Sequence, residues 1–209
     1  MLRVLTLAAR FRARNGRARP AFLRAREGST AVEFALLALP FLAILSAILE
    51  VAIGSWAQDM LQQAVSDAGR QIYTGRFQKG TAGTSGSANL LDAFRSQLCQ
   101  ENGQPRNTLF ACANVRLNIQ QVDDFQNVAL VAPTAVNPAT GASDWNPAFG
   151  SAYACGRTSA IVVIQAAVDF PVFFALLNPG AVTLPGGRRV LQAATVFRVE
   201  PYDSTGVCS

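Results

Sequence analysis

An uncharged apolar run near the N-terminus constrains this chain more than any other feature. No charged residue occurs from Phe34 to Leu49, and the apolar run extends to about Ala57 if Glu50 lies at its far edge. A membrane-spanning helix needs about 20 mostly apolar residues. We therefore expect a transmembrane helix over residues 29–57.

The residues that precede this run form a basic leader. Residues 1–28 contain eight arginines and one glutamate, whereas the rest of the chain has ten basic and twelve acidic residues. Basic residues beside a span stay in the cytoplasm, so the leader is predicted to be cytoplasmic and the rest exported. Because the basic excess is confined to the leader, we expect no nucleic-acid binding.

The helical pattern continues past the predicted span. Apolar residues recur at three- and four-residue spacing from Met60 to Ile72, and a threonine-glycine pair follows. This spacing indicates an amphipathic helix, and glycine often ends one. We expect one long helix over residues 29–74. The exported extension of the predicted span is the segment 58–75, which includes the glycine that ends the helix.

The remaining residues predict a small α+β domain over 89–209, after a flexible linker at 76–88 that is rich in glycine and serine. A short amphipathic helix is expected at the start of this domain. Alternating or β-branched residues then predict strands at 114–122, 159–170 and 188–199, with a weaker candidate at 125–132 and an irregular loop at 133–156. The predicted fold class is α+β, with a mainly antiparallel sheet.

An apolar segment, PVFFALL at residues 171–177, lies between two of these strands. Its proline start and the following NPG predict a single helical turn or an apolar loop. Lone apolar turns usually bury inward, so we expect core packing in preference to membrane contact.

The cysteines all lie in the part of the chain that this topology exports: Cys99, Cys112, Cys155 and Cys208. An oxidising compartment favours structural disulfides, and four cysteines allow three connectivities. We expect one local bridge, Cys99 to Cys112, and a second, Cys155 to Cys208, that ties the C-terminus to the sheet.

Catalytic motifs are missing from the sequence. The chain has no histidine, no G-x-S-x-G, no P-loop and no G-x-G-x-x-G motif. The one adjacent acidic pair, Asp123 and Asp124, is better interpreted as a solvated turn. We expect no enzymatic activity, no metal and no cofactor, and favour a role in assembly.

The junction of leader and helix, REGSTAVEF, carries a more specific pattern. It places Gly28 directly before the helix and a carboxylate, Glu33, where hydrocarbon should begin. This arrangement resembles the prepilin site of type IV pilins and pseudopilins, in which a membrane peptidase cuts after the glycine. The resemblance implies a cut between Gly28 and Ser29, which makes Glu33 the fifth residue of the mature chain.

Further segments resemble the TadE family of tight-adherence pilus assembly proteins: DAGRQIYTG (67–75), FRSQLC (94–99), Cys112 before a strand, AIVVIQAAVDFP (160–171) and FRVEPYD (197–203). The major pilins of this pathway usually follow the glutamate with tyrosine, whereas this chain has Phe34 and a larger globular part. The resemblance therefore implies a minor pseudopilin that helps to initiate or mature Flp-type pili.

This resemblance also implies a location and partners. The processed protein would be a single-pass protein of the bacterial inner membrane with a periplasmic C-terminal domain. Its partners would be a prepilin peptidase, other pseudopilins and the pilus assembly platform. Glu33 would reach the N-terminal amine of a neighbouring subunit and hold the helices in register, although a glutamate that snorkels into the headgroups is an alternative.

Two other functions remain open on the sequence. One is a secreted protein whose ordinary signal peptide is cut after Ala57, because Ser55 and Ala57 satisfy the small-residue rule. The other is an uncleaved signal-anchored protein with a binding or structural domain unrelated to pili. Glu33 and Glu50 at the ends of the apolar run argue against the signal peptide.

Overall fold

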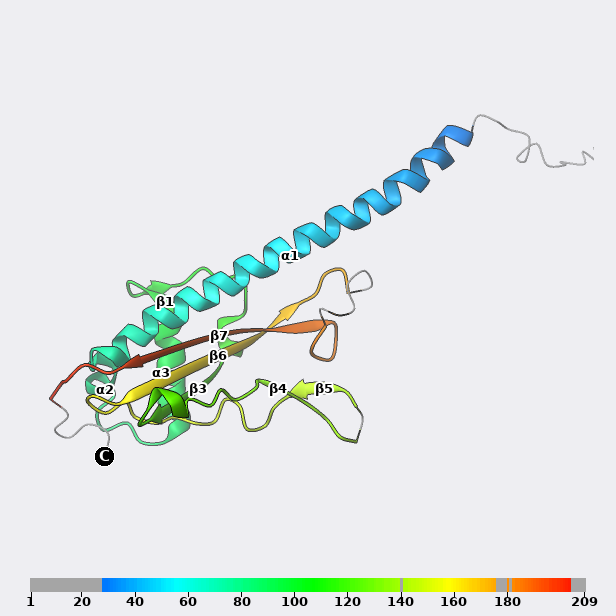
Figure 1. Ribbon diagram of the computed structural model, residues 1–209. Helices are drawn as coiled ribbons and strands as arrows, with labels where there is room; N and C mark the ends of the chain where they lie inside the picture. The colour runs from blue at the N-terminus through cyan, green and yellow to red at the C-terminus, as the bar shows by residue number, and fades with distance from the viewer. Residues whose placement is uncertain (1–27, 140, 176–179, 181, 204–209) are drawn as a thin grey trace, which may run out of the picture. The chain divides into compact units, whose positions relative to one another are not determined.

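The computed structural model describes residues 28–139, 141–175, 180 and 182–203. Two compact units are present, Met1–Leu42 and Ala43–Ser209, and the first helix, α1 (Ser29–Tyr73), begins in one and ends in the other. The chain is an α+β protein, in which a long apolar helix is followed by small antiparallel sheets (Figure 1). The predicted fold class is confirmed.

The α1 helix ends within one residue of the predicted boundary because of Gly75. This glycine has a left-handed backbone with φ 71°, and its N–H donates to the Ile72 carbonyl at 3.1 Å. The N–H of Thr74 likewise donates to the Arg70 carbonyl at 3.1 Å. These bonds satisfy carbonyls of the last turn, as is common where a glycine ends a helix.

Residues 76–80 differ from the flexible linker that we expected over 76–88. They form a short helix, α2 (Arg76–Gly80), in which Phe77 and Gln78 are buried. The Phe77 ring meets the Phe94 ring edge to face, with centroids 5.4 Å apart. Gln78 donates to the carbonyls of Ile72 and Gly156 at 3.1 and 2.9 Å. Tertiary packing of Phe77 and Gln78 therefore orders the first part of the segment that we expected to be a linker.

The main sheet has three antiparallel strands in the order β3-β6-β7. Their bounds are β3 (Arg116–Val122), β6 (Ile161–Pro171) and β7 (Arg188–Arg198). In the register, Ile164 of the central strand lies opposite Ile119 on one side and Thr195 on the other. The three main predicted strands are therefore present, each within two residues of its expected bounds.

The core lies between one face of this sheet and the helices α1 and α3 (Ser87–Leu98). Gly69 allows α1 to approach closely, because a Cβ atom there would lie 3.2 Å from Cε1 of Phe197 and 3.4 Å from Cγ2 of Thr195. Buried members include, from the helices, Ala57, Leu61, Val65, Ile72, Phe94 and Leu98, and from the sheet, Leu117, Ile119, Val162, Ile164, Val168 and Leu191.

The opposite face of the sheet is covered by an irregular segment rather than by another strand. The Gln165 side chain accepts from the N–H of Val131 at 3.1 Å and donates to its carbonyl at 3.0 Å. The strand that we expected at 125–132 is wrong: a 3-10 turn, η4 (Phe125–Asn127), begins this region. A side chain thus supplies the hydrogen bonds that a neighbouring strand would have supplied.

Short elements complete the second unit. The loop that we expected to be irregular contains a hairpin of β4 (Thr134–Val136) and β5 (Ser143–Trp145). A second hairpin joins β1 (Gln100–Glu101) to β2 (Gln104–Pro105), and a 3-10 turn, η3 (Cys112–Asn114), precedes β3. Strands of two or three residues are too short for a periodic sequence pattern to reveal them.

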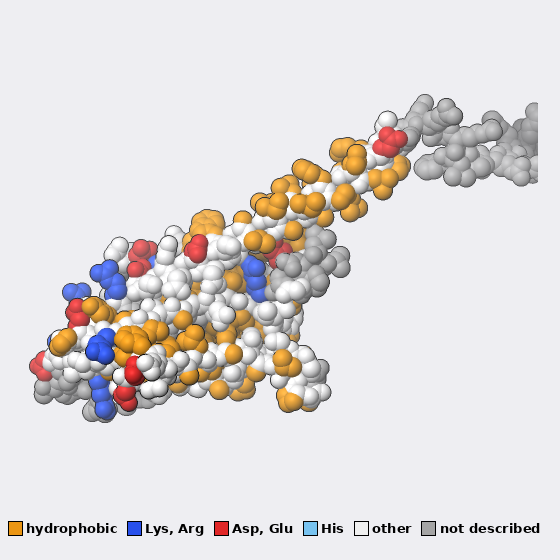
Figure 2. Space-filling model, in the orientation of Figure 1, with side chains coloured by type: hydrophobic (Ala, Val, Ile, Leu, Met, Phe, Trp, Pro, Cys, Tyr) orange, Lys and Arg blue, Asp and Glu red, His pale blue; other side chains and the backbone are white. Residues whose placement is uncertain are grey.

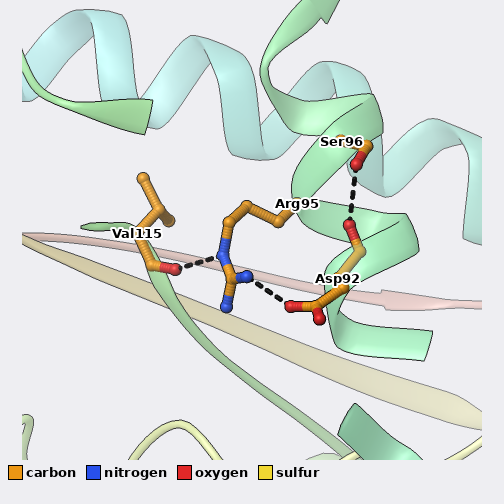
Figure 3. Close-up of polar contacts among 4 residues, drawn as sticks. All are labelled: Asp92, Arg95, Ser96 and Val115. Atoms are coloured by element: carbon orange, nitrogen blue, oxygen red, sulfur yellow. Dashed lines mark hydrogen bonds and ion pairs between the residues drawn. The ribbon is translucent and has the colours of Figure 1, made fainter. Parts of the chain in front are cut away.

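Helix α3 is fixed to the start of β3 by polar and covalent contacts. Arg95 Nε donates to the Val115 carbonyl at 2.7 Å, and its guanidinium pairs with Asp92 one turn earlier (Figure 3). A disulfide joins Cys99 to Cys112, with the two Cα atoms 5.9 Å apart. The end of α3 and the segment before β3 are therefore held together.

Candidate processing and assembly site

The predicted processing site lies at the start of α1. Gly28 immediately precedes the helix and is exposed, and a Cβ atom at this residue would meet no atom of the described residues within 4 Å beyond its chain neighbours. The helix itself begins at Ser29. The arginines of the leader lie outside the described residues. The candidate site therefore combines an exposed glycine with the first residue of a long helix.

The predicted assembly residues follow on the first turns of α1. The side chains of Glu33 and Phe34 are both exposed, and Phe34 is 73 % exposed. The helix places Glu33 four residues after Ser29, which is about one turn. This spacing brings the carboxylate close to the backbone nitrogen that a cut after Gly28 would convert into an amine.

The first unit exposes apolar side chains on every side of the helix: Val32, Phe34, Leu36, Leu37, Leu39, Phe41 and Leu42. Within the described residues, α1 from Thr30 onward is the one helix whose length and composition would allow it to cross a membrane. A helix that is apolar all around suits either a protein core or a bilayer. The exposure of these side chains favours a bilayer, so this helix could be a membrane anchor.

The second acidic residue of α1, Glu50, lies in a different environment. Its side chain is only 3 % exposed, and its Oε2 accepts a hydrogen bond from the backbone N–H of Phe174 at 2.9 Å. Its Oε1 is buried and has no hydrogen-bond partner among the residues that the structure describes. The sequence indicated only a charge at the edge of an apolar run, whereas the structure shows that Glu50 holds the segment after β6 against α1.

Gly54, one turn further along α1, leaves space that the side chain of Arg189 occupies. A Cβ atom at Gly54 would collide with the Arg189 guanidinium. The Arg189 Cζ atom also lies 5.4 Å from the centroid of the Phe170 ring, within the range of a cation–π contact. The sequence analysis did not predict this packing. A glycine inside an apolar helix was the one sequence feature that could have indicated a close approach of another side chain. Contacts between α1 and the sheet therefore begin before residue 57, the predicted end of the span.

Two of the motifs that resemble the TadE family meet at the other end of α1. The N–H of Glu200 donates to the Tyr73 carbonyl at 3.0 Å, and a side-chain hydrogen bond from Tyr73 to Glu200 raises the pKa of Tyr73. The Tyr202 hydroxyl donates to the Gly156 carbonyl at 2.7 Å. The segments 67–75 and 197–203 therefore lie side by side, and their contact joins the end of α1 to the segment that follows β7.

The remaining predicted site residues are cysteines. Cys155 is disulfide-bonded, but its predicted partner Cys208 lies outside the described residues. Across the part of the chain that the structure describes, no group of three or more histidine, cysteine, aspartate or glutamate side chains is arranged to hold a metal ion.

These observations define a class of protein: a chain with one helix that could anchor it in a membrane, continued by an α+β unit. Comparison with protein families is more specific, because the model described as TadE-like protein matches residues 28–70. The matched residues run from Gly28 through Glu33 to the last turn of α1. The predicted resemblance to the TadE-like family is therefore confirmed over residues 28–70, and this similarity implies involvement in tight-adherence pilus assembly.

No curated protein and no solved structure matches the chain.

Proposed function

We propose that this protein is a minor pseudopilin that helps to initiate or mature Flp-type pili after a prepilin peptidase cuts behind Gly28. The observation that carries this proposal is the TadE-like match, which begins at Gly28, together with a helix that begins at Ser29. In this role the protein associates with other pseudopilins and the assembly platform, and no catalytic activity of its own is required.

The processing step is supported by the surroundings of Gly28. An exposed glycine without a side chain can enter a narrow protease cleft in an extended conformation, and no described residue crowds the Cβ position of Gly28. The eight arginines of the leader favour a cytoplasmic N-terminus. The cut would therefore occur at the cytoplasmic face of the inner membrane, and the second unit would be periplasmic.

Glu33 supplies a means of aligning subunits. An ionised carboxylate costs about 2.5–3.5 kcal/mol at the centre of a membrane helix, so a cationic partner stabilises it within the bilayer. The amine that a cut creates at Ser29 is such a partner. We place the amine of one subunit against Glu33 of its neighbour, where the low dielectric strengthens the pair and fixes the axial register of the two helices.

Assembly through α1 is further favoured because both edges of the main sheet already have hydrogen-bond partners. On the β3 edge, Ile119 donates to the Ala152 carbonyl at 2.9 Å and accepts from the N–H of Ala154 at 2.8 Å. On the β7 edge, the Gln62 side chain of α1 donates to the Ala194 carbonyl at 3.2 Å. Adding a strand from another subunit would have to displace these contacts.

The packing around Ala57 argues against a secreted protein that is cut at this residue. Ala57 is fully buried in the core, and Glu50 and Gly54 contact the segment after β6 and Arg189, respectively. The compact second unit begins at Ala43. Cleavage after Ala57 would remove these contacts, so a retained anchor is the better proposal.

The experiment that tests the proposal is sequencing of the mature N-terminus, in a host that carries the prepilin peptidase. We expect Ser29 as the first residue. Gly28→Val should accumulate as the full-length precursor, because the branched side chain hinders entry into the protease cleft. The matched control is Gly80→Val, since Gly80 also has no atom within 4 Å of a Cβ position and is remote from the site.

Three results would contradict this function. Efficient cleavage of Gly28→Val would show that the glycine is not the recognition element. A native terminus at Gln58 would instead support an ordinary signal peptide. An uncut but membrane-inserted protein would favour the alternative of a signal-anchored protein unrelated to pili.

A further inference from the structure

Two aromatic side chains remain exposed directly after β6. Val172 is buried, as we expected for this segment, but Phe173 and Phe174 are 59 % and 40 % exposed. Our expectation of core packing is therefore wrong for these two residues. The Phe173 ring meets the Phe170 ring edge to face, with centroids 6.3 Å apart, which holds the ring against the end of the strand.

The backbone of Phe174 is tied to α1 at Glu50. The 2.9 Å hydrogen bond from its N–H to the carboxylate fixes where along the helix the two phenylalanines lie. On α1 itself, apolar side chains close to this point are exposed: Ile48, Leu49, Val51, Ile53 and Trp56. The two rings therefore adjoin an apolar surface that the second unit leaves uncovered.

The length of the helix indicates what covers this surface. A hydrocarbon core about 30 Å thick is crossed by about 20 helical residues. Counted from Ser29, the first residue of α1, such a span ends close to Glu50. The Phe174 attachment would then lie at the outer boundary of the bilayer.

We propose that Phe173 and Phe174 form a second contact with the membrane, inserted at the interface of the outer leaflet beside α1. The partner is the phospholipid bilayer, and the inference rests on the proposed membrane anchoring of α1. Phenylalanine side chains are favoured at the boundary between headgroups and acyl chains because they bury apolar area where the hydrocarbon begins. The contact would hold the Pro171 end of β6 at the bilayer surface.

Charge does not drive this contact. Among the described residues, Arg188 pairs with Asp169 at 2.6 Å, and Arg189 lies against the Phe170 ring. Glu50 and Asp59 are two further acidic groups of this neighbourhood. Two basic and three acidic groups leave no positive excess, so the neighbourhood offers little attraction to anionic headgroups. Insertion of the two rings should therefore occur equally well in neutral and in anionic lipid.

The test is photo-crosslinking of the full-length protein in phosphatidylcholine vesicles. The photoreactive amino acid benzoylphenylalanine replaces one residue at a time, and mass spectrometry identifies what becomes attached. Phe173 is the test position. Phe125 is a matched control, because it is 53 % exposed but follows β3, whose end at Val122 pairs with the opposite end of β6 at Ile161. Leu42, 56 % exposed in the first unit, reports on the anchor.

We expect lipid adducts at Leu42 and Phe173, with the yield at Phe173 several-fold above that at Phe125. Adducts at Leu42 without an excess at Phe173 would overturn the second contact and leave the anchor intact. No adducts at Leu42 would remove the anchor and this inference together. A crosslink from Phe173 to a second copy of the chain would show a protein partner, and would also overturn the inference.

The same measurement in vesicles that contain phosphatidylglycerol tests the role of charge. We expect an unchanged ratio of the Phe173 and Phe125 yields. Adducts that form at Phe173 only with the anionic lipid would overturn insertion driven by apolar burial.

Discussion

The Gln58 side chain pairs with the backbone of Gln192 on the outer edge of β7. Its Oε1 accepts from the Gln192 N–H at 3.3 Å, and its Nε2 donates to the carbonyl of the same residue. An amide side chain of α1 thereby takes the place of a neighbouring strand. Figure 1 shows α1 running beside β7, and Figure 2 shows that the exposed surface of α1 changes from apolar to mixed along its length.

Replacing Gln58 by leucine should loosen this edge. One net hydrogen bond contributes about 1 kcal/mol to stability, so we expect a destabilisation of about this size and faster amide hydrogen exchange at Gln192. Hydrogen exchange measured by mass spectrometry on the protein in detergent checks this. Gln63→Leu is the control, because Gln63 is exposed on the same helix. Equal exchange at Gln192 in the two variants would contradict the role of Gln58.

Replacing Glu50 by alanine should release the segment after β6. The N–H of Phe174 loses its acceptor, and an unsatisfied, partly buried donor costs about 1–3 kcal/mol. We expect faster exchange at Phe174 and a lower lipid adduct yield at Phe173, without a change at Leu42. Glu50→Gln keeps an acceptor oxygen and should retain most of the contact. Identical behaviour of the two variants would show that the hydrogen bond is unimportant.

Replacing Glu33 by alanine should abolish pilus assembly without affecting processing. The variant should be cut normally and remain in the membrane, because Gly28 and the apolar side chains are unchanged, but it lacks the charge that aligns subunits. Pili are counted by electron microscopy at matched protein levels. The control is Glu50→Gln, which removes the charge of the acidic residue at the other end of the apolar run. This variant should still assemble pili. Wild-type piliation of Glu33→Ala would favour a glutamate that only snorkels into the headgroups.

Removing the bridge between Cys99 and Cys112 should destabilise the second unit. Closing a loop with a sequence separation of 13 residues contributes about 3 kcal/mol by chain entropy. The double variant Cys99→Ser, Cys112→Ser should therefore unfold at a lower denaturant concentration. Non-reducing peptide mapping of the wild type should give a peptide that joins these cysteines, and another that joins Cys155 to Cys208. A peptide joining Cys112 to Cys155 would refute this pairing.

Alkaline unfolding should depend on Tyr153. Burial, and to a smaller extent the charge of Tyr202, raises the pKa of Tyr153 to about 12 from 10.0. Because the folded state holds this proton more tightly, its contribution to stability is complete below pH 10 and is lost as the pH rises from 10 to 12. Tyr153→Phe should lose less stability across this range in denaturation at several pH values. Parallel pH profiles of variant and wild type would contradict the assignment.

The extent of α1 could be predicted from the sequence because its signals are local. An apolar run of this length can bury its backbone polar groups in a bilayer only as a helix, and Gly75 favours the left-handed conformation that ends it. The strands β3, β6 and β7 were predictable for the same reason, since β-branched and alternating residues favour a half-buried strand.

Contacts between distant residues were not predictable. Glu50 and Phe174, or Gln165 and Val131, are paired by the register and stacking of elements far apart in the chain. The sequence around these residues contains no pattern that indicates which residue each of them contacts. Phe77 is a similar case, because its burial in a helix at the start of the expected linker could not be predicted from the local sequence.

The sequence by itself determined the long helix, the three main strands and the junction of Gly28 with an apolar segment that contains Glu33, because each depends on residues close together in the chain. Only the tertiary structure decided which acidic side chain of α1 is buried and which is exposed. Glu33 is exposed, whereas Glu50 lies beneath the segment that follows β6. Burial depends on what packs against a residue, and that is set by the whole fold.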